Sequence, residues 1–153
     1  MKKYWYKTTM LVMALGAFTA CNDDDEPKGP EGPIAPVNGA YVINTGNWNE
    51  NNGTIQWYDR DLKTVSADLF AAANGAGIGD AQDLCIYGSK IYITCSSSAK
   101  IEIVDRKDFK RIKTLNLTNE SGQPIQPRYM TAAKGNIYFT AYDGTVSQID
   151  TTS

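Results

Sequence analysis

The feature that most constrains the fold is a four-strand pattern that recurs with a period of about 45 residues. Residues 82–117 contain four short runs rich in Ile, Val, Leu, Tyr and Thr, separated by turn-forming residues. β-Branched and aromatic residues favour strands, and a meander of four short strands cannot bury both of its faces alone. The pattern therefore predicts one unit of a larger, repeated sheet architecture.

Two landmarks carry the period into the neighbouring units. The aspartates that close the third run of each unit lie 46 and then 45 residues apart, and the tyrosines that open the second runs lie 51 and then 46 apart. These residues are Asp59, Asp105 and Asp150, and Tyr41, Tyr92 and Tyr138. The longer first spacing fits an insertion around residues 48–52. Four strands per unit at this period predict an all-β fold, an incomplete β-propeller of about two and a half four-stranded antiparallel blades. Chance similarity between the strands of a β-sandwich is the alternative.

The predicted propeller part covers residues 39–153, with blade pieces at about 40–70, 82–117 and 129–150. In the first unit, the runs at 41–44, 54–59 and 64–70 match strands two, three and four of the central unit. A partial ring of this kind is expected to expose apolar residues on its blade faces. The residues expected there are Ile101, Ile103, Ile137 and Phe139.

The repeat motif also resembles a known family. The Tyr-Val-Ile-Asn and Tyr-Ile-Thr openings at residues 41 and 92, each followed by a strand that ends in Asp, are similar to YVTN-type, YncE-like β-propellers. Residues 41–59, with Asn-Thr-Gly-Asn-Trp and a downstream Asn-Asn-Gly, resemble surface-exposed propeller lipoproteins of Gram-negative bacteria, some of which bind cobalamin for an outer-membrane importer. The resemblance implies a non-catalytic module that captures a corrinoid or another nutrient for an outer-membrane transporter. The chain departs from the family in having room for about two and a half blades instead of roughly seven.

The N-terminus reads as an export signal. Residues 1–20 combine three lysines with an apolar run that is too short to span a bilayer as a helix, which indicates a secretory signal peptide. The run ends in Thr19-Ala20-Cys21, which resembles a lipobox, so we predict lipidation of Cys21. A weak membrane anchor, or an ordinary cleaved signal with an incidental cysteine, are the alternatives.

Residues 21–38 are predicted to form a lipidated tether. Asn22 is followed by four consecutive acidic residues, which resemble the signal that exports some lipoproteins to the outer leaflet. Residues 27–38 hold four prolines and two glycines, a composition that favours a semi-extended spacer over a helix or a central strand. The sequence therefore predicts an outer-membrane lipoprotein exposed on the cell surface, in contact with the membrane through the lipid on Cys21.

Charge and composition narrow the function classes. Residues 39–153 carry 11 basic and 12 acidic side chains, so we expect no nucleic-acid partner. The chain contains no histidine, the commonest general base and metal ligand, and we predict no catalytic residue, metal or cofactor. The alternatives are a propeller enzyme of the lactonase or lyase type and a protein–protein interaction scaffold.

Two cysteines of the central unit are predicted to be unpaired. With Gly88-Ser89 as a two-residue turn, Cys85 faces Tyr92 and Gln82 faces Cys95. Because alternation sends successive side chains to opposite faces, the two thiols point away from each other. We therefore expect two buried free thiols and no disulfide.

The connections between runs fall into two classes. Those at one end of the units are short, whereas the opposite ones are long and span residues 45–53, 71–81 and 118–128. In a meander the long connections emerge on one rim, where binding loops lie on a rigid scaffold. We predict a ligand site on this rim, and the alternative is that Trp48 packs into the core against the next blade. The predicted ligand-binding residues are Asn47, Trp48, Asn49, Arg128, Tyr129 and Tyr142.

Overall fold

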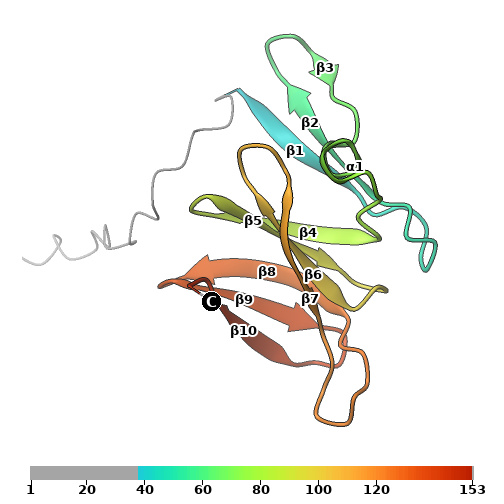
Figure 1. Cartoon of the computed structure of the whole chain (residues 1–153), viewed down its shortest axis with the longest axis vertical. Coiled ribbons are helices and arrows are strands. Elements are labelled where there is room, and N and C mark those ends of the chain that lie inside the picture. Colours follow the sequence, from blue (N-terminus) through green and yellow to red (C-terminus); the bar gives the residue numbers. More distant parts are fainter. Residues whose placement is uncertain (1–37, 153) are drawn as a thin grey trace, which may run out of the picture.

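The computed structural model describes residues 38–152, which form three antiparallel sheets arranged side by side (Figure 1). The first sheet contains β1 (Gly39–Asn44), β2 (Thr54–Asp59) and β3 (Thr64–Val65). The second contains β4 (Ala81–Tyr87), β5 (Lys90–Cys95), β6 (Lys100–Asp105) and β7 (Arg111–Asn116), and the third contains β8 (Pro127–Ala133), β9 (Asn136–Ala141) and β10 (Val146–Asp150). In every sheet the strands follow one another in chain order. The architecture confirms the predicted all-β fold of blade-like antiparallel meanders.

The register of the central hairpin follows the sequence prediction near the turn and departs from it further along. Tyr87 pairs with Lys90 and Cys85 pairs with Tyr92, as the two-residue turn at Gly88 requires. A β-bulge between Ala81 and Asp83 then shifts the ladder, so that Ala81 instead of Gln82 faces Cys95. Both cysteines are free, as predicted, and they lie against different faces of the sheet. Cys95 is buried as expected, whereas Cys85 is only partly buried.

The two inner strands of the central sheet, β5 and β6, are buried on both faces, one face against each neighbouring sheet. This explains why β5 and β6 read as nearly continuous apolar runs instead of alternating ones. The first apolar cluster lies between sheets one and two and comprises Ile55, Phe70, Ile78, Ala81, Ile91, Ile93, Cys95, Val104 and Phe109. The second lies between sheets two and three and comprises Tyr92, Ile101, Ile103, Ile137 and Phe139.

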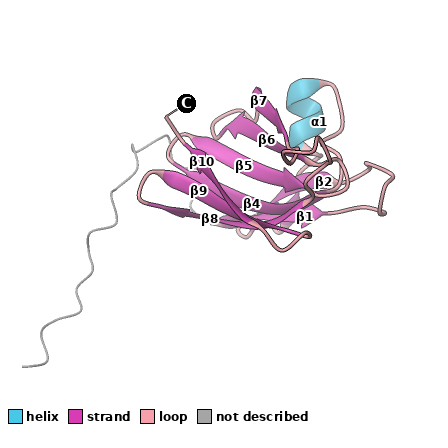
Figure 2. Cartoon of the chain, turned by 90° about the horizontal axis from the view of Figure 1, so that it is seen from below, coloured by secondary structure: helices cyan, strands magenta, loops and turns pink. Residues whose placement is uncertain are grey.

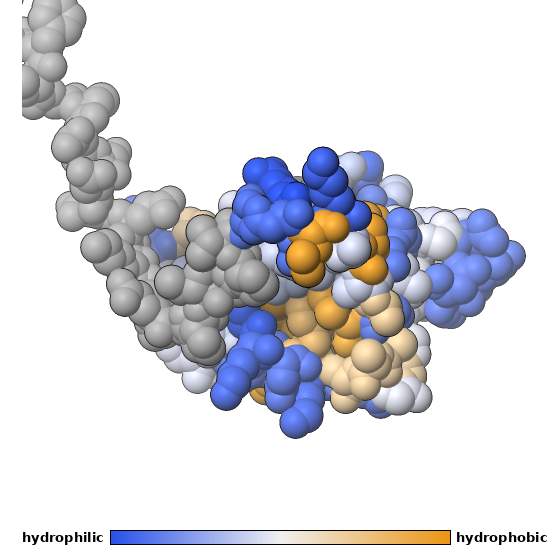
Figure 3. All heavy atoms as spheres, turned by 90° about the horizontal axis from the view of Figure 1, so that it is seen from above, coloured by the Kyte–Doolittle hydropathy of each residue, from blue (hydrophilic) through white to orange (hydrophobic). Residues whose placement is uncertain are grey.

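The prediction that blade faces at Ile101, Ile103, Ile137 and Phe139 would be exposed is therefore wrong. These residues are buried against one another, because alternation in β6 and β9 turns them toward the shared interface. The apolar surface that remains exposed lies elsewhere, for example at Val42 on the outer face of β1 and at Val65. Figure 3 views the molecule from above Figure 1, from the end where the first sheet lies. This face shows apolar surface flanked by hydrophilic groups.

The fourth strand of the first unit is shorter than predicted. Residues 64–70 were expected to form a strand, but only Thr64–Val65 pairs with β2, and a short helix, α1 (Leu69–Asn74), follows. Asp68 caps this helix by accepting from Phe70 N at 3.1 Å, and Gly75 closes it in a left-handed conformation with φ 65°. Strong helix formers between two caps outweigh the strand pattern at this point. Figure 2 shows α1 at one end of the stacked sheets, beside β2.

The predictions for residues 1–37, including the signal peptide, the lipidation of Cys21 and most of the tether, lie outside the described residues. Within residues 38–152, the structure contains no helix that is long and apolar enough to cross a membrane.

Candidate functional site

The connection between β1 and β2, residues 45–53, forms a structured loop that we call the rim loop. The Glu50 carboxylate accepts hydrogen bonds from the side-chain amides of Asn47 (2.8 Å) and Asn52 (3.0 Å). The amide oxygen of Asn52 in turn accepts from Asn47 N at 2.8 Å. Asn49 and Asn51 take the left-handed backbone conformation, with φ 64° and 53°, which asparagine tolerates better than most residues. These contacts hold the loop in a defined shape before any ligand arrives.

The rim loop is also fastened to the central sheet. Gly53 N donates to Gly79 O at 2.7 Å, and the Ser98 hydroxyl lies 2.6 Å from Oδ1 of Asn51. Ser98 is itself held by Asp80, a carboxylate with 0% exposure that accepts from the backbone N–H of Ser98 at 3.2 Å. The loop therefore extends from the first sheet across the end of the second.

Asp80 serves as the anchor of this region. Burial alone would raise the pKa of Asp80, but hydrogen bonds from the backbone N–H groups of Ser97 and Ser98 and from the Ser98 hydroxyl outweigh it and lower the pKa below its ordinary value. The sequence suggested only a turn at residues 96–98. The role of this turn in holding the rim loop was missed, because its partner carboxylate, Asp80, comes from a different connection of the chain.

Four predicted site residues meet on this rim, and we call them the aromatic–arginine cluster. The rings of Trp48 and Tyr142 are 5.9 Å apart between centroids, at an interplanar angle of 75°. The Arg128 guanidinium carbon lies 4.6 Å from the Tyr142 ring centroid and 5.1 Å from that of Tyr129. The cluster thus joins the rim loop of the first unit to two segments of the third.

The aromatic rings of the cluster remain accessible. Trp48 is 51% exposed, Tyr142 49% and Tyr129 53%. The alternative in which Trp48 is a core residue therefore does not describe this structure. Asn47 and Asn49 flank Trp48 in the rim loop, and the amide of Asn47 is engaged with Glu50 and not with the cluster.

Backbone contacts fix the third-unit side of the cluster. The Thr94 hydroxyl donates to Arg128 O at 2.8 Å, which ties β8 to β5 of the neighbouring sheet. Tyr142 N donates to Gln126 O at 3.0 Å, so the β9–β10 connection lies against the segment that leads into β8. Arg128 and Tyr142 are therefore positioned by the main chain as well as by their ring contact.

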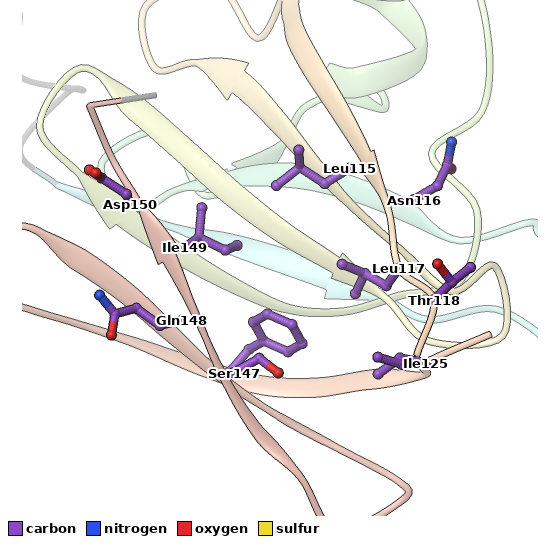
Figure 4. A pocket seen from close by; sticks show the side chains of 10 residues that line it. Leu115, Asn116, Leu117, Thr118, Ile125, Ser147, Gln148, Ile149 and Asp150 are labelled. Carbon is purple, nitrogen blue, oxygen red and sulfur yellow. The ribbon is translucent and has the colours of Figure 1, made fainter. Parts of the chain in front are cut away.

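A separate groove lies between β7 and β10 and extends to the connection that follows β7 (Figure 4). It encloses about 470 Å³. Its lining residues are Leu115, Asn116, Leu117, Thr118, Ile125, Phe139, Ser147, Gln148, Ile149 and Asp150. In the second unit β7 pairs with the third strand, whereas no described strand pairs with the equivalent edge of β10. The groove could not be predicted from the sequence, because it forms between residues of two units.

Other buried ionisable groups have structural partners. The Glu102 carboxylate, 1% exposed, forms ion pairs with Lys100 at 2.8 Å and Arg111 at 3.0 Å, and Thr114 donates to it at 2.7 Å. Burial raises the pKa of the Cys95 thiol to about 12, so this thiol is protonated at neutral pH. Among residues 38–152, no group of three or more His, Cys, Asp or Glu side chains is placed to hold a metal ion.

The sheets and their rim define this chain as part of a β-propeller with an aromatic–arginine cluster on one rim. A solved structure with this likeness is the β-propeller domain of Cps50 (Swd1) from Myceliophteria thermophila, at 11% identity and a TM-score of 0.50, over 80% of this chain and 39% of that one. The computationally designed Ika4 protein is similar at 12% identity and a TM-score of 0.43, over 68% of this chain and 62% of that one.

The chain thus spans about two fifths of the length of the Cps50 domain. Comparison with protein-family models and with curated proteins finds no match. The likeness to the Cps50 domain confirms a partial β-propeller fold, and it does not extend to the lipoprotein family that the repeat motif resembles.

Proposed function

We propose that this protein is a non-catalytic ligand-binding module that captures a small molecule on its rim. The observation that carries the proposal is the aromatic–arginine cluster, in which exposed rings and a guanidinium are held together by residues from two units. Exposed Trp and Tyr beside polar side chains on a rigid scaffold are typical of binding sites, because rigid rings supply contact area at low entropic cost. The prearranged rim loop lowers the cost of ordering further.

The location and the ligand belong to the same proposal. The lipobox-like Thr19-Ala20-Cys21, the acidic run and the Pro-rich tether support an outer-membrane lipoprotein exposed on the cell surface. The resemblance of residues 41–59 to cobalamin-binding propeller lipoproteins names a corrinoid as the first ligand to test, for delivery to an outer-membrane transporter. The tether would give the rim the distance from the membrane that such a delivery needs.

Substitution of Trp48 tests the rim site. In the full-length protein, cyanocobalamin binding would be measured by calorimetry for wild type and for Trp48→Ala. We expect binding to weaken by about 2 kcal/mol or more, roughly 30-fold, as for an aromatic anchor at the centre of a contact. The melting temperature should change little, since half of the Trp48 side chain is already in solvent.

Trp57→Phe provides the matched control. Trp57 is half-buried in β2, packs edge-on against Tyr41 with ring centroids 4.9 Å apart, and lies outside the rim loop. This variant should lower stability and leave affinity unchanged. The opposite pattern for Trp48→Ala, a large loss of stability with unchanged affinity, would show that Trp48 is structural and that the ligand binds elsewhere.

A further inference from the structure

We infer that the rim site selects ligands that carry an oxyanion, a carboxylate or a phosphate, next to a ring, with Arg128 as the anion-binding group. The inference rests on the proposed function, because it assumes that the aromatic–arginine cluster is the ligand site. It goes further by assigning the charge of the ligand and the residue that binds the charged group.

The positive charge of Arg128 has no acidic partner among the described residues. A guanidinium has five N–H donors, and no hydrogen bond or ion pair from the Arg128 side chain occurs within residues 38–152. Its Nε is buried and lacks an acceptor there. Arg111, by contrast, donates from its Nε to Glu102 at 3.0 Å. The other N–H donors of Arg128 also lack an acceptor within residues 38–152 and are not buried like the Nε, so an outside acceptor can use them.

The acidic side chains of the rim loop and of the β9–β10 connection are already engaged elsewhere. Glu50 accepts from Asn47 and Asn52, and Asp143 accepts from the backbone N–H and the hydroxyl of Thr145, at 3.0 Å and 2.7 Å. Neither forms an ion pair with Arg128. These two carboxylates thus accept from neutral donors, which leaves the guanidinium available to a ligand.

Stacking fixes the plane in which Arg128 offers its donors. The guanidinium lies over the rings of Tyr142 and Tyr129, which orients it without using any of its N–H groups. A planar, prearranged guanidinium suits a carboxylate or phosphate, which accepts two parallel hydrogen bonds. Arg128 is therefore better arranged for an oxyanion than a flexible lysine would be.

The ring of the ligand is placed by the same contacts. Tyr142 touches both Trp48 and Arg128, so a molecule that lies on the Trp48–Tyr142 corner has the guanidinium directly beside it. The two rings meet at 75°, which makes an open corner for a puckered or bulky ring instead of a narrow slot for a flat one. Ring and anion should therefore lie close together within one ligand.

Two sources of this chemistry can be compared with matched probes. Trigalacturonate carries a carboxylate on each sugar ring, and galactotriose is its neutral counterpart. Cyanocobalamin carries a phosphodiester in its nucleotide loop, and dicyanocobinamide lacks that loop. Binding of all four probes to the full-length protein would be measured by calorimetry and by tryptophan fluorescence.

We expect the member of one pair that carries the oxyanion to bind about tenfold or more tightly than the partner without it. The preference should disappear in Arg128→Gln and persist in Arg106→Gln. Arg106 is a matched control because its Nε is also buried without an acceptor among the described residues. Its backbone N–H donates to Ser89 O, which places it at the turn on the opposite end of the sheet. The preference should also shrink as NaCl rises from about 0.05 to about 0.5 M, because exposed charge pairs are screened. If Arg128→Gln fails to fold, the salt series in wild type still tests whether the site recognises the charge of the ligand, and a preference that does not change with salt would overturn the inference.

Equal binding of both members of each pair would overturn the inference about the anion and leave the proposed rim site standing. A preference that survives in Arg128→Gln would also overturn it, since the anion would then be read by another group. If none of the four probes binds, both the inference and the corrinoid proposal fail.

Discussion

Removal of the Asp80 carboxylate should strongly destabilise the fold and loosen the rim loop. Asp80 is fully buried and accepts from the backbone N–H groups of Ser97 and Ser98, and its Oδ1 also lies 3.0 Å from the Ser98 hydroxyl. Asp80→Ala leaves two partly buried donors without an acceptor, each in the lower half of the range of about 1–3 kcal/mol. We therefore expect a loss of about 2–4 kcal/mol in the free energy of unfolding.

Asp80→Asn separates the hydrogen bonds from the charge. The amide oxygen keeps an acceptor in place, so the expected loss is smaller, about 1 kcal/mol, the difference between charged and neutral hydrogen bonds. Asp143→Ala is the control, because Asp143 is an exposed turn carboxylate of the same rim whose side chain accepts hydrogen bonds from Thr145. It should change stability less than either Asp80 variant.

The pH dependence gives an independent check. Because the pKa of Asp80 is lowered in the folded state, its charge contributes stability above the unfolded pKa of about 4, and this contribution is lost as pH falls through the folded pKa. Urea unfolding, followed by tryptophan fluorescence between about pH 7 and pH 3, should show the gap between wild type and Asp80→Asn closing at low pH. Asp80→Ala as stable as wild type, or a gap that does not change with pH, would refute this account.

Three further predictions concern other parts of the chain. Cys95, with a pKa of about 12, should resist alkylation in the native protein more than Cys85. Both thiols should react after denaturation without reductant. A mass two daltons low with neither thiol modified would show a disulfide and contradict the prediction that both cysteines are free. The protein should self-associate with rising concentration in analytical ultracentrifugation, since β1 and β10 each pair on one side only within the described sheets. Val146→Lys at the β10 edge should reduce this association, whereas Leu62→Lys in an exposed turn should not, and a monomer at every concentration would count against it. Cys21→Ala should abolish incorporation of a fatty-acid analogue in cells, and equal labelling of wild type and variant would exclude lipidation there.

Local patterns in the sequence determined much of the fold. The alternation of apolar residues and the two-residue turn at Gly88 specify that Cys85 faces Tyr92, because a hairpin register depends on turn length and on which face is buried. The same period placed the long connections on one rim and named four residues that the structure brings together there. Both inferences needed only neighbours along the chain.

The tertiary structure decided what depends on contacts between units. The bulge that pairs Ala81 with Cys95 and the early end of β3 before α1 arise where caps and packing outweigh a strand pattern. The meeting of Trp48 with Tyr142, 94 residues later in the chain, depends on how one loop crosses the end of the central sheet. Periodicity fixes which face of a strand a residue occupies, whereas the side chain that it meets on the next sheet is set by the packing of the sheets.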